Sequence, residues 1–197
     1  MYKIALVLIL WPFTTMCFGQ DSGVEKSING VQIRGYLGQR ELFGFSAFNE
    51  SRLSRSLTLR VEIGIDARRF KPDSIINVDE FDLLFTPSVL FEPRWYFSLN
   101  QRNAKGKSTT GNSGSFLSLR TYYRPSVFSL PASDLKSYVD QASLIPSLGL
   151  KRSITKNLYF ESDIGFGYRY RFVDDREVSG YNGEAILIVN VSFTYSF

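Results

Sequence analysis

Residues 157 to 172, NLYFESDIGFGYRYRF, alternate between apolar and polar side chains with almost no interruption. This period of two predicts a β-strand, because successive side chains of a strand point to opposite faces. The apolar face, which only Ser162 interrupts, contains Leu158, Phe160, Ile164, Phe166, Tyr168, Tyr170 and Phe172. The other face contains Glu161, Asp163, Gly165, Gly167, Arg169 and Arg171. The alternation fits a soluble sandwich with apolar groups inside, and equally a membrane barrel with apolar groups outside.

The composition of the two faces favours the membrane barrel. Tyr and Phe gather toward the ends of the apolar face, as the aromatic girdles of a membrane interface would. Glycine and both charge signs on the other face suit a tightly packed polar interior. The same inverted pattern recurs in residues 56–66, 88–97, 115–123 and 184–197. These segments have about the 9 to 11 residues that a tilted strand needs to cross a bilayer.

Counting the strands tests this interpretation. Seven strong strands are predicted, at 41–51, 55–66, 87–98, 115–124, 143–152, 157–172 and 184–197. A single-chain bacterial outer-membrane barrel has an even number of strands. The parity rule therefore predicts an eighth, and residues 31–38 are the remaining candidate. The predicted fold class is all-β: an eight-stranded antiparallel up-and-down transmembrane β-barrel, with an interior just wide enough to be filled by side chains.

The lengths of the connections orient this barrel. Short segments at 49–56 and 153–157 are predicted periplasmic turns, and longer segments near 67–86, 125–142 and 173–183 are predicted outer loops. The stretch at 100–115, NQRNAKGKSTTGNSGS, is low in complexity and predicts a mobile basic loop. This loop falls on the periplasmic side, where connections are usually short, so it fits the topology poorly.

The first residues predict an exported protein. Lys3 precedes a ten-residue apolar stretch, and small residues follow at Cys17 and Gly19, which is the plan of a secretory signal peptide. We therefore predict a signal peptide at 1–19 and one barrel domain at 20–197. Lipidation of Cys17 is the alternative, but Met16 and Thr14 do not match a lipoprotein signal. Cleavage after Gly19 leaves the mature chain without cysteine.

Composition narrows the possible chemistry. The 197 residues contain no His, which removes the commonest general base and the commonest metal ligand. The net charge is +4, but no run of five like charges occurs, so nucleic-acid binding is not predicted. No metal spacing and no phosphate-binding glycine loop is found in the sequence. The sequence therefore predicts no cofactor and no enzyme activity.

The polar strand faces bring charges into the predicted lumen. This lumen charge cluster contains Arg60, Glu62, Glu92, Arg94, Arg120, Glu161, Asp163, Arg169 and Arg171, with Glu50, Asp66 and Lys151 on the same faces. One interpretation is a ligand site or an ion path. The other is an ion-pair core, because buried charges must be paired. A narrow lumen favours the ion-pair core. Glu161 and Asp163 are spaced for acid–base chemistry, but neutralisation by Arg169 and Arg171 is the simpler interpretation.

Several aromatic side chains are candidates for a ligand platform or for anchors at a membrane interface. Interface anchoring is the prediction for most of them. The residues are Trp95, Tyr96, Tyr122, Tyr123, Tyr168 and Tyr170.

The chain closes with VSFTYSF, in which Val191, Phe193, Tyr195 and Phe197 alternate with polar residues. With the signal peptide and the inverted alternation, this segment resembles the small outer-membrane β-barrel proteins of Gram-negative bacteria. In that family a last strand with a terminal aromatic residue is the insertion signal that the barrel-assembly machinery reads. The resemblance therefore implies this machinery and outer-membrane lipid as partners. It does not imply an activity, because one barrel scaffold carries many functions.

The sequence leaves three functions in order of preference. The first is a non-enzymatic, monomeric outer-membrane barrel with a plugged, charge-paired interior, which acts structurally or through its outer loops on an unknown extracellular partner. The second is a narrow pore for small solutes. The third is a soluble exported barrel, like a lipocalin, that holds an apolar ligand and turns its Phe, Leu and Ile faces inward.

Overall fold

The computed structural model describes residues 23–37, 41–70, 82–126, 139–172 and 182–197. The predicted signal peptide at 1–19, with Cys17, lies outside the described residues. The strands are β1 (Ser27–Leu37), β2 (Glu41–Arg52), β3 (Leu57–Phe70), β4 (Asp82–Trp95), β5 (Ser115–Arg124), β6 (Gln141–Ser153), β7 (Leu158–Arg171) and β8 (Gly183–Ser196). Two short helical segments, α1 (Leu99–Ala104) and η2 (Thr110–Asn112), stand between β4 and β5. In these ranges no helix has the length and apolar character to cross a membrane.

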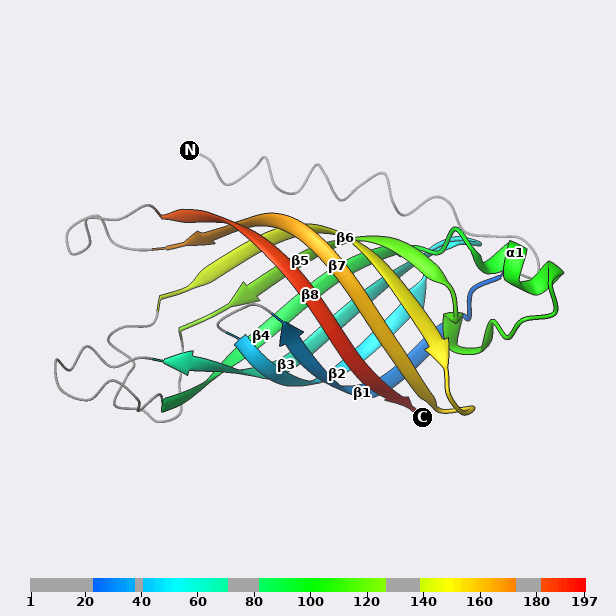
Figure 1. Ribbon diagram of the computed structural model, residues 1–197, viewed down its shortest axis with the longest axis horizontal. Coiled ribbons are helices and arrows are strands. Elements are labelled where there is room, and N and C mark those ends of the chain that lie inside the picture. The colour runs from blue at the N-terminus through cyan, green and yellow to red at the C-terminus, as the bar shows by residue number, and fades with distance from the viewer. Residues whose placement is uncertain (1–22, 38–40, 71–81, 127–138, 173–181) are drawn as a thin grey trace, which may run out of the picture.

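The eight strands form one closed barrel in which each strand pairs antiparallel with its neighbour in the chain (Figure 1). The ring closes where β1 pairs with β8, for example Ile33 with Phe193. This confirms the predicted all-β, eight-stranded, antiparallel up-and-down fold, including the strand that parity alone required. Closure leaves no strand with an unpaired edge.

Two strands are longer at one end than the sequence pattern indicated. β3 runs on to Phe70 and β4 begins at Asp82, whereas the predicted strands covered 55–66 and 87–98. The ladder continues here, with Ala67 opposite Phe85 and Arg69 opposite Leu83. Backbone pairing to a neighbouring strand extends both strands beyond the clearest alternation, which is why the predicted boundaries were too short.

The predicted inversion of the faces is confirmed. Ile63 on β3 is 67% exposed, whereas Arg60 and Glu62 on the same strand are buried. Every strand has large apolar side chains outside and polar or charged side chains inside, and a smaller number of apolar side chains, such as Leu90, Ile145 and Ile188, are also buried inside. Exposed outward residues, one from each strand in order, are Val31, Phe45, Ile63, Phe91, Leu117, Leu144, Ile164 and Leu187.

The segment between β4 and β5 is ordered, contrary to the predicted mobile loop at 100–115. In Figure 1 it lies at the end of the barrel where β8 finishes, and we call this the α1 end. Leu99 of α1 is buried in an apolar cluster with Val24, Tyr96 and Phe116. The polar composition concealed this role, because the segment contributes one apolar anchor and otherwise uses its backbone and small side chains to pack.

Glycine is required at one point of this segment. Gly111 has φ +62°, in the left-handed region, and a Cβ atom there would lie 2.1 Å from the ring of Tyr159. No larger residue fits without displacing that ring. Asn112, which follows, also has a positive φ of 61° and is fully buried. The two residues turn the chain so that the Asn112 side chain points into the barrel.

Interface anchoring was predicted for most of six aromatic side chains, and two of the six lie inside the barrel. Tyr96 and Tyr122 are buried inside the barrel, at 1% and 3% exposure. Both occupy inward positions of the strand alternation, and their hydroxyl groups bond to charged side chains. The other four lie on the outer face, and these are Trp95, Tyr123, Tyr168 and Tyr170.

Candidate functional site

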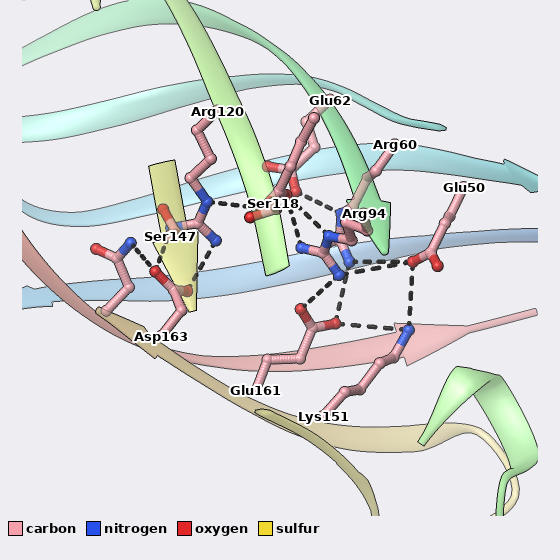
Figure 2. A network of polar contacts seen from close by, with 12 residues as sticks. Glu50, Arg60, Glu62, Arg94, Ser118, Arg120, Ser147, Lys151, Glu161 and Asp163 are labelled. Atoms are coloured by element: carbon pink, nitrogen blue, oxygen red, sulfur yellow. Dashed lines mark hydrogen bonds and ion pairs between the residues drawn. The ribbon is translucent and has the colours of Figure 1, made fainter. Parts of the chain in front are cut away.

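The interior contains one continuous network of buried charges, which we call the central lattice (Figure 2). None of its ionised residues is more than 5% exposed. Its carboxylates are Glu50, Glu62, Glu92, Glu161 and Asp163, and its cations are Arg34, Arg60, Arg94, Arg120 and Lys151. The lattice therefore contains equal numbers of acidic and basic side chains.

Glu161 on β7 joins the two sides of the lattice. Its Oε1 accepts a hydrogen bond from Arg60 Nη1 at 3.0 Å, and its Oε2 accepts one from Arg94 Nη1, also at 3.0 Å. Lys151 Nζ lies 3.6 Å from Oε1. Three cations from three strands thus surround one carboxylate. The two arginines bind it by charge-assisted hydrogen bonds, which are of the strong kind, and Lys151 contacts it as an ion pair.

Glu50 on β2 connects the lattice to the α1 end. Its Oε1 accepts hydrogen bonds from the Tyr96 hydroxyl at 2.9 Å and from Asn112 Nδ2 at 2.8 Å. Its Oε2 lies 3.5 Å from Lys151 Nζ and 3.6 Å from Arg94 Nη1. The segment between β4 and β5 is thereby bound to the buried charges, with the Asn112 side chain fully buried at that end of the barrel.

Two further carboxylates extend the lattice across the lumen. Glu92 accepts a bond from Arg94 Nη2 at 2.7 Å and from Arg120 Nε at 2.8 Å. Arg120 in turn makes a two-pronged contact with Asp163, which also accepts from Asn190 Nδ2 at 2.9 Å.

Glu62 completes the lattice on the side of β1 and β3. Both of its oxygens accept from Arg34 Nη2 at 2.9 Å, and its Oε1 also accepts from Arg60 Nε at 2.6 Å. With Asn190, the lattice draws on all eight strands, so its side chains span the lumen from wall to wall.

Burial explains the composition of the lattice. Moving an ion out of water costs several kcal/mol, which only close counter-charges and further hydrogen bonds can offset. Aromatic rings add to this compensation: the Arg60 guanidinium lies 3.8 Å from the centre of the Phe48 ring, and that of Arg94 lies 4.5 Å from the Phe116 ring. Carboxylates held in this way are committed to their cations, which suits a structural role better than proton transfer.

The structure divides the predicted lumen charge cluster into two groups. Arg60, Glu62, Glu92, Arg94, Arg120, Glu161 and Asp163 all belong to the central lattice, as do Glu50 and Lys151. Arg169 and Arg171 do not. They lie toward the opposite end, where Arg169 contacts Glu41 at 3.3 Å and Arg171 contacts Glu184 at 2.8 Å.

The predicted neutralisation of Glu161 and Asp163 by Arg169 and Arg171 was therefore wrong. Arg169 follows Asp163 by six positions, which is about 20 Å along an extended strand. Charges on one strand lie at different heights along the barrel. The cations that pair with Glu161 and Asp163 come instead from other strands, across the lumen.

The prediction also missed several interior residues. Arg34, Glu41 and Arg124 are each buried and each paired with an opposite charge, Arg124 with Asp66 at 2.9 Å. Their inward parity was visible in the alternation of their strands. Arg34 in particular lies between the outward residues Val31, Ile33 and Leu37 of the weakest predicted strand, and for this reason its role was overlooked.

The four residues of the predicted insertion signal lie on the outward positions of β8 and just beyond it. Phe193 and Tyr195 are about half exposed, Phe197 is 77% exposed, and Val191 is partly covered. Phe193 packs edge-on against Phe160 of β7, with 5.7 Å between ring centres. Recognition of these residues by an assembly machinery stays a prediction.

Asp140, just outside β6, has a perturbed acidity. Its carboxylate accepts hydrogen bonds from the backbone and hydroxyl of Ser126 at 2.7 and 2.6 Å and from the Tyr123 hydroxyl at 2.6 Å, and these bonds hold its pKa below the ordinary value. A carboxylate whose pKa is lowered in the folded state stabilises the fold at neutral pH. This stabilisation is lost as the pH falls through the lowered pKa.

We expect the connection at Asp140 to loosen only below about pH 4, where an ordinary aspartate becomes protonated. Because the group is exposed, the effect is below about 1 kcal/mol. Limited proteolysis between pH 3 and 7 checks this. Asp140→Asn should already show the acid-state cleavage at pH 7, and an unchanged cleavage rate in that variant would contradict the assignment.

Among the described residues, no group of three or more His, Cys, Asp or Glu side chains has the arrangement of a metal site. Neither a protein-family model nor a curated protein matches the sequence. The function of the charged interior is therefore inferred from its geometry.

Proposed function

We propose that this protein is an integral outer-membrane β-barrel, non-enzymatic and closed, which acts structurally or through the segments that connect its strands at the end opposite α1. The observation that carries the proposal is the inversion of the barrel. Exposed large apolar side chains surround it on every strand, while ten ionised side chains of the central lattice are buried inside.

Such an exterior is unfavourable in water. Soluble monomers rarely expose contiguous apolar surface beyond a few hundred Å². Lipid hydrocarbon would cover this surface, and a closed barrel satisfies its backbone hydrogen bonds internally, as a bilayer requires. Exposed aromatic residues near the strand ends, such as Trp95 and Tyr170, are placed as interface anchors would be.

The interior supports a plugged barrel over the two other predicted functions. A lipocalin-like barrel needs its apolar faces inward, whereas these strands turn their charges inward and most of their large apolar side chains outward, apart from a small buried cluster around Leu90, Ile145 and Ile188. A pore needs an open lumen, whereas the central lattice draws on every strand and Asn112 anchors a covering segment to it. The proposed role is therefore that of a rigid support in the membrane.

Heat-modifiability tests the membrane barrel. The protein is extracted from the outer-membrane fraction with detergent and run on a gel with and without boiling. We expect the protein in that fraction, with a faster-moving band in the unboiled sample, because a closed barrel resists the detergent used in electrophoresis. Recovery from the soluble fraction without detergent, and without a band shift, would refute the proposal.

Conductance in planar bilayers tests the closed interior separately. We expect no stable current steps from the reconstituted protein, because the central lattice fills the lumen. Reproducible single-channel steps would replace the plugged barrel with the narrow pore, even if the protein is a membrane barrel.

A further inference from the structure

The α1 end of the barrel carries an unusually basic surface. Eight Lys and Arg side chains lie there at least partly exposed: Lys26, Arg52, Arg55, Arg102, Lys105, Lys107, Arg152 and Lys156. Of the described residues at this end, Glu25 is the one exposed acid, and it accepts a hydrogen bond from the backbone of Gly111. We call the five fully exposed members, Lys26, Arg55, Lys105, Lys107 and Lys156, the basic rim.

The basic rim comes from four separate parts of the chain. Lys26 precedes β1, Arg55 lies in the turn between β2 and β3, Lys105 and Lys107 follow α1, and Lys156 lies in the turn between β6 and β7. Arg102 beneath the rim is also close enough to Arg152 to repel it electrostatically. This concentration of positive charge is not balanced within the described residues, in contrast to the balanced central lattice.

The basic rim lies next to the exposed apolar side chains of the outer face, which we call the apolar outer belt. Arg55 belongs to the turn that leads into Leu57, and Leu57 is paired with Trp95 on the outer face. Trp95 and Phe97, with ring centres 6.0 Å apart, are about half exposed at this end. The surface thus changes along the barrel from apolar side chains to aromatic rings and then to exposed cations. In a phospholipid leaflet these would contact the acyl chains, the interface and the headgroups, respectively.

From this arrangement we infer that the basic rim binds anionic phospholipid headgroups of the leaflet at the α1 end, and so selects acidic lipids around this part of the barrel. The inference rests on the proposed membrane function and specifies which lipid that function involves. The rim's exposed ammonium and guanidinium groups attract a negatively charged membrane surface at short range, and salt screens that attraction.

Trp95 offers a direct measurement. The chain contains two tryptophans, Trp11 and Trp95, so the Trp11→Phe variant of the full chain leaves Trp95 as the one fluorescent indole. This variant is reconstituted into vesicles of phosphatidylcholine containing either brominated phosphatidylcholine or brominated phosphatidylglycerol. Bromine quenches an indole at short range, so the quenching reports which lipid contacts the α1 end.

We expect the association constant of phosphatidylglycerol at this position to exceed that of phosphatidylcholine by about fivefold at low salt, as one basic side chain at an anionic surface provides. The ratio should fall toward one in about 1 M salt, where the Debye length is about 3 Å. It should also fall toward one when all five rim residues are replaced by Gln.

A matched pair of single variants controls for general charge effects. Arg55→Gln removes a cation from the turn that leads into the Leu57–Trp95 pair, whereas Arg69→Gln removes an exposed cation at the other end of β3. The first should lower the ratio, and the second should leave it unchanged. All these residues are exposed, so the variants should retain the fold, and the heat-modifiable band verifies that each has folded.

The outcomes separate this inference from the proposed function. Quenching by neither brominated lipid would mean that Trp95 does not contact lipid, which overturns the membrane function and the lipid site together. Equal quenching by the two lipids would leave the membrane barrel intact and overturn the lipid selection. In that case an acidic macromolecule outside the bilayer would be the partner to test for the basic rim.

Discussion

Replacing Glu161 with Gln should lower the free energy of unfolding by about 3 to 5 kcal/mol, the cost of breaking a buried ion pair by removing one partner. The amide keeps the shape of the side chain but removes the charge that Arg60, Arg94 and Lys151 share. Those cations would then be buried with too little counter-charge. Urea unfolding of the protein in lipid vesicles, followed by the loss of the heat-modifiable band, measures the change.

Glu184→Gln is the matched control. Glu184 also contacts two arginines, Arg169 and Arg171, but its side chain is 39% exposed. Water can replace the lost contacts there, so we expect a loss of about 1 kcal/mol or less. Equal losses for the two variants would contradict the view that burial in the central lattice sets the cost.

A double variant tests the charge balance itself. Adding Lys151→Met to Glu161→Gln removes one charge of each sign, so the lattice is again neutral. We expect the double variant to be at least about 1 kcal/mol more stable than the sum of the two single losses, because the two residues interact directly at 3.6 Å. Simple additivity would show that the two charges are not coupled.

Replacing Ile63 with Arg should cost about 2 to 4 kcal/mol if lipid surrounds the barrel, the range measured for arginine at the bilayer midplane. Ile63 lies near the middle of β3, points outward and is 67% exposed, so it loses few protein contacts on replacement. In water the same change on an exposed surface would be worth about 0.5 kcal/mol or less. The unfolding free energy in vesicles therefore distinguishes the two environments.

Ile154→Arg provides the comparison. Ile154 is also exposed, at 53%, but it lies in the turn between β6 and β7 at the α1 end. Near an interface the cost of arginine falls to about 0 to 1 kcal/mol. A small, equal effect at both positions would indicate that the belt around Ile63 is covered by something other than hydrocarbon.

The period-two pattern predicted the fold because the direction of successive side chains in a strand is a local property. Residues 157–172 form β7 with the expected side chains inward, and parity required the strand that became β1. The alternation separated the two faces of this strand, and the composition of the faces then assigned Glu161 inward and Phe166 outward. The same alternation also places Tyr96 inward, two positions after Arg94, although Tyr96 was a candidate for an interface anchor.

The segment at 100–115 shows a second limit of the pattern. Its Gly, Ser, Asn and Lys residues carry no periodic apolar signal, so composition predicted a mobile loop. Its order depends on contacts that are remote in the sequence: Leu99 packs against Val24, and Asn112 donates to Glu50. Backbone turns at Gly111 and Asn112 make these contacts possible, and no local pattern reports them.

The sequence by itself determined which side chains enter the lumen, because the alternation of each strand separates two faces and their composition distinguishes the inner face from the outer one. Only the tertiary structure decided how the charges pair. Glu161 is bonded to Arg60, about 100 residues away, and not to Arg169 on its own strand. Pairing across a lumen depends on the tilt and register of all eight strands, which come from the closure of the whole sheet, and no single strand contains that information.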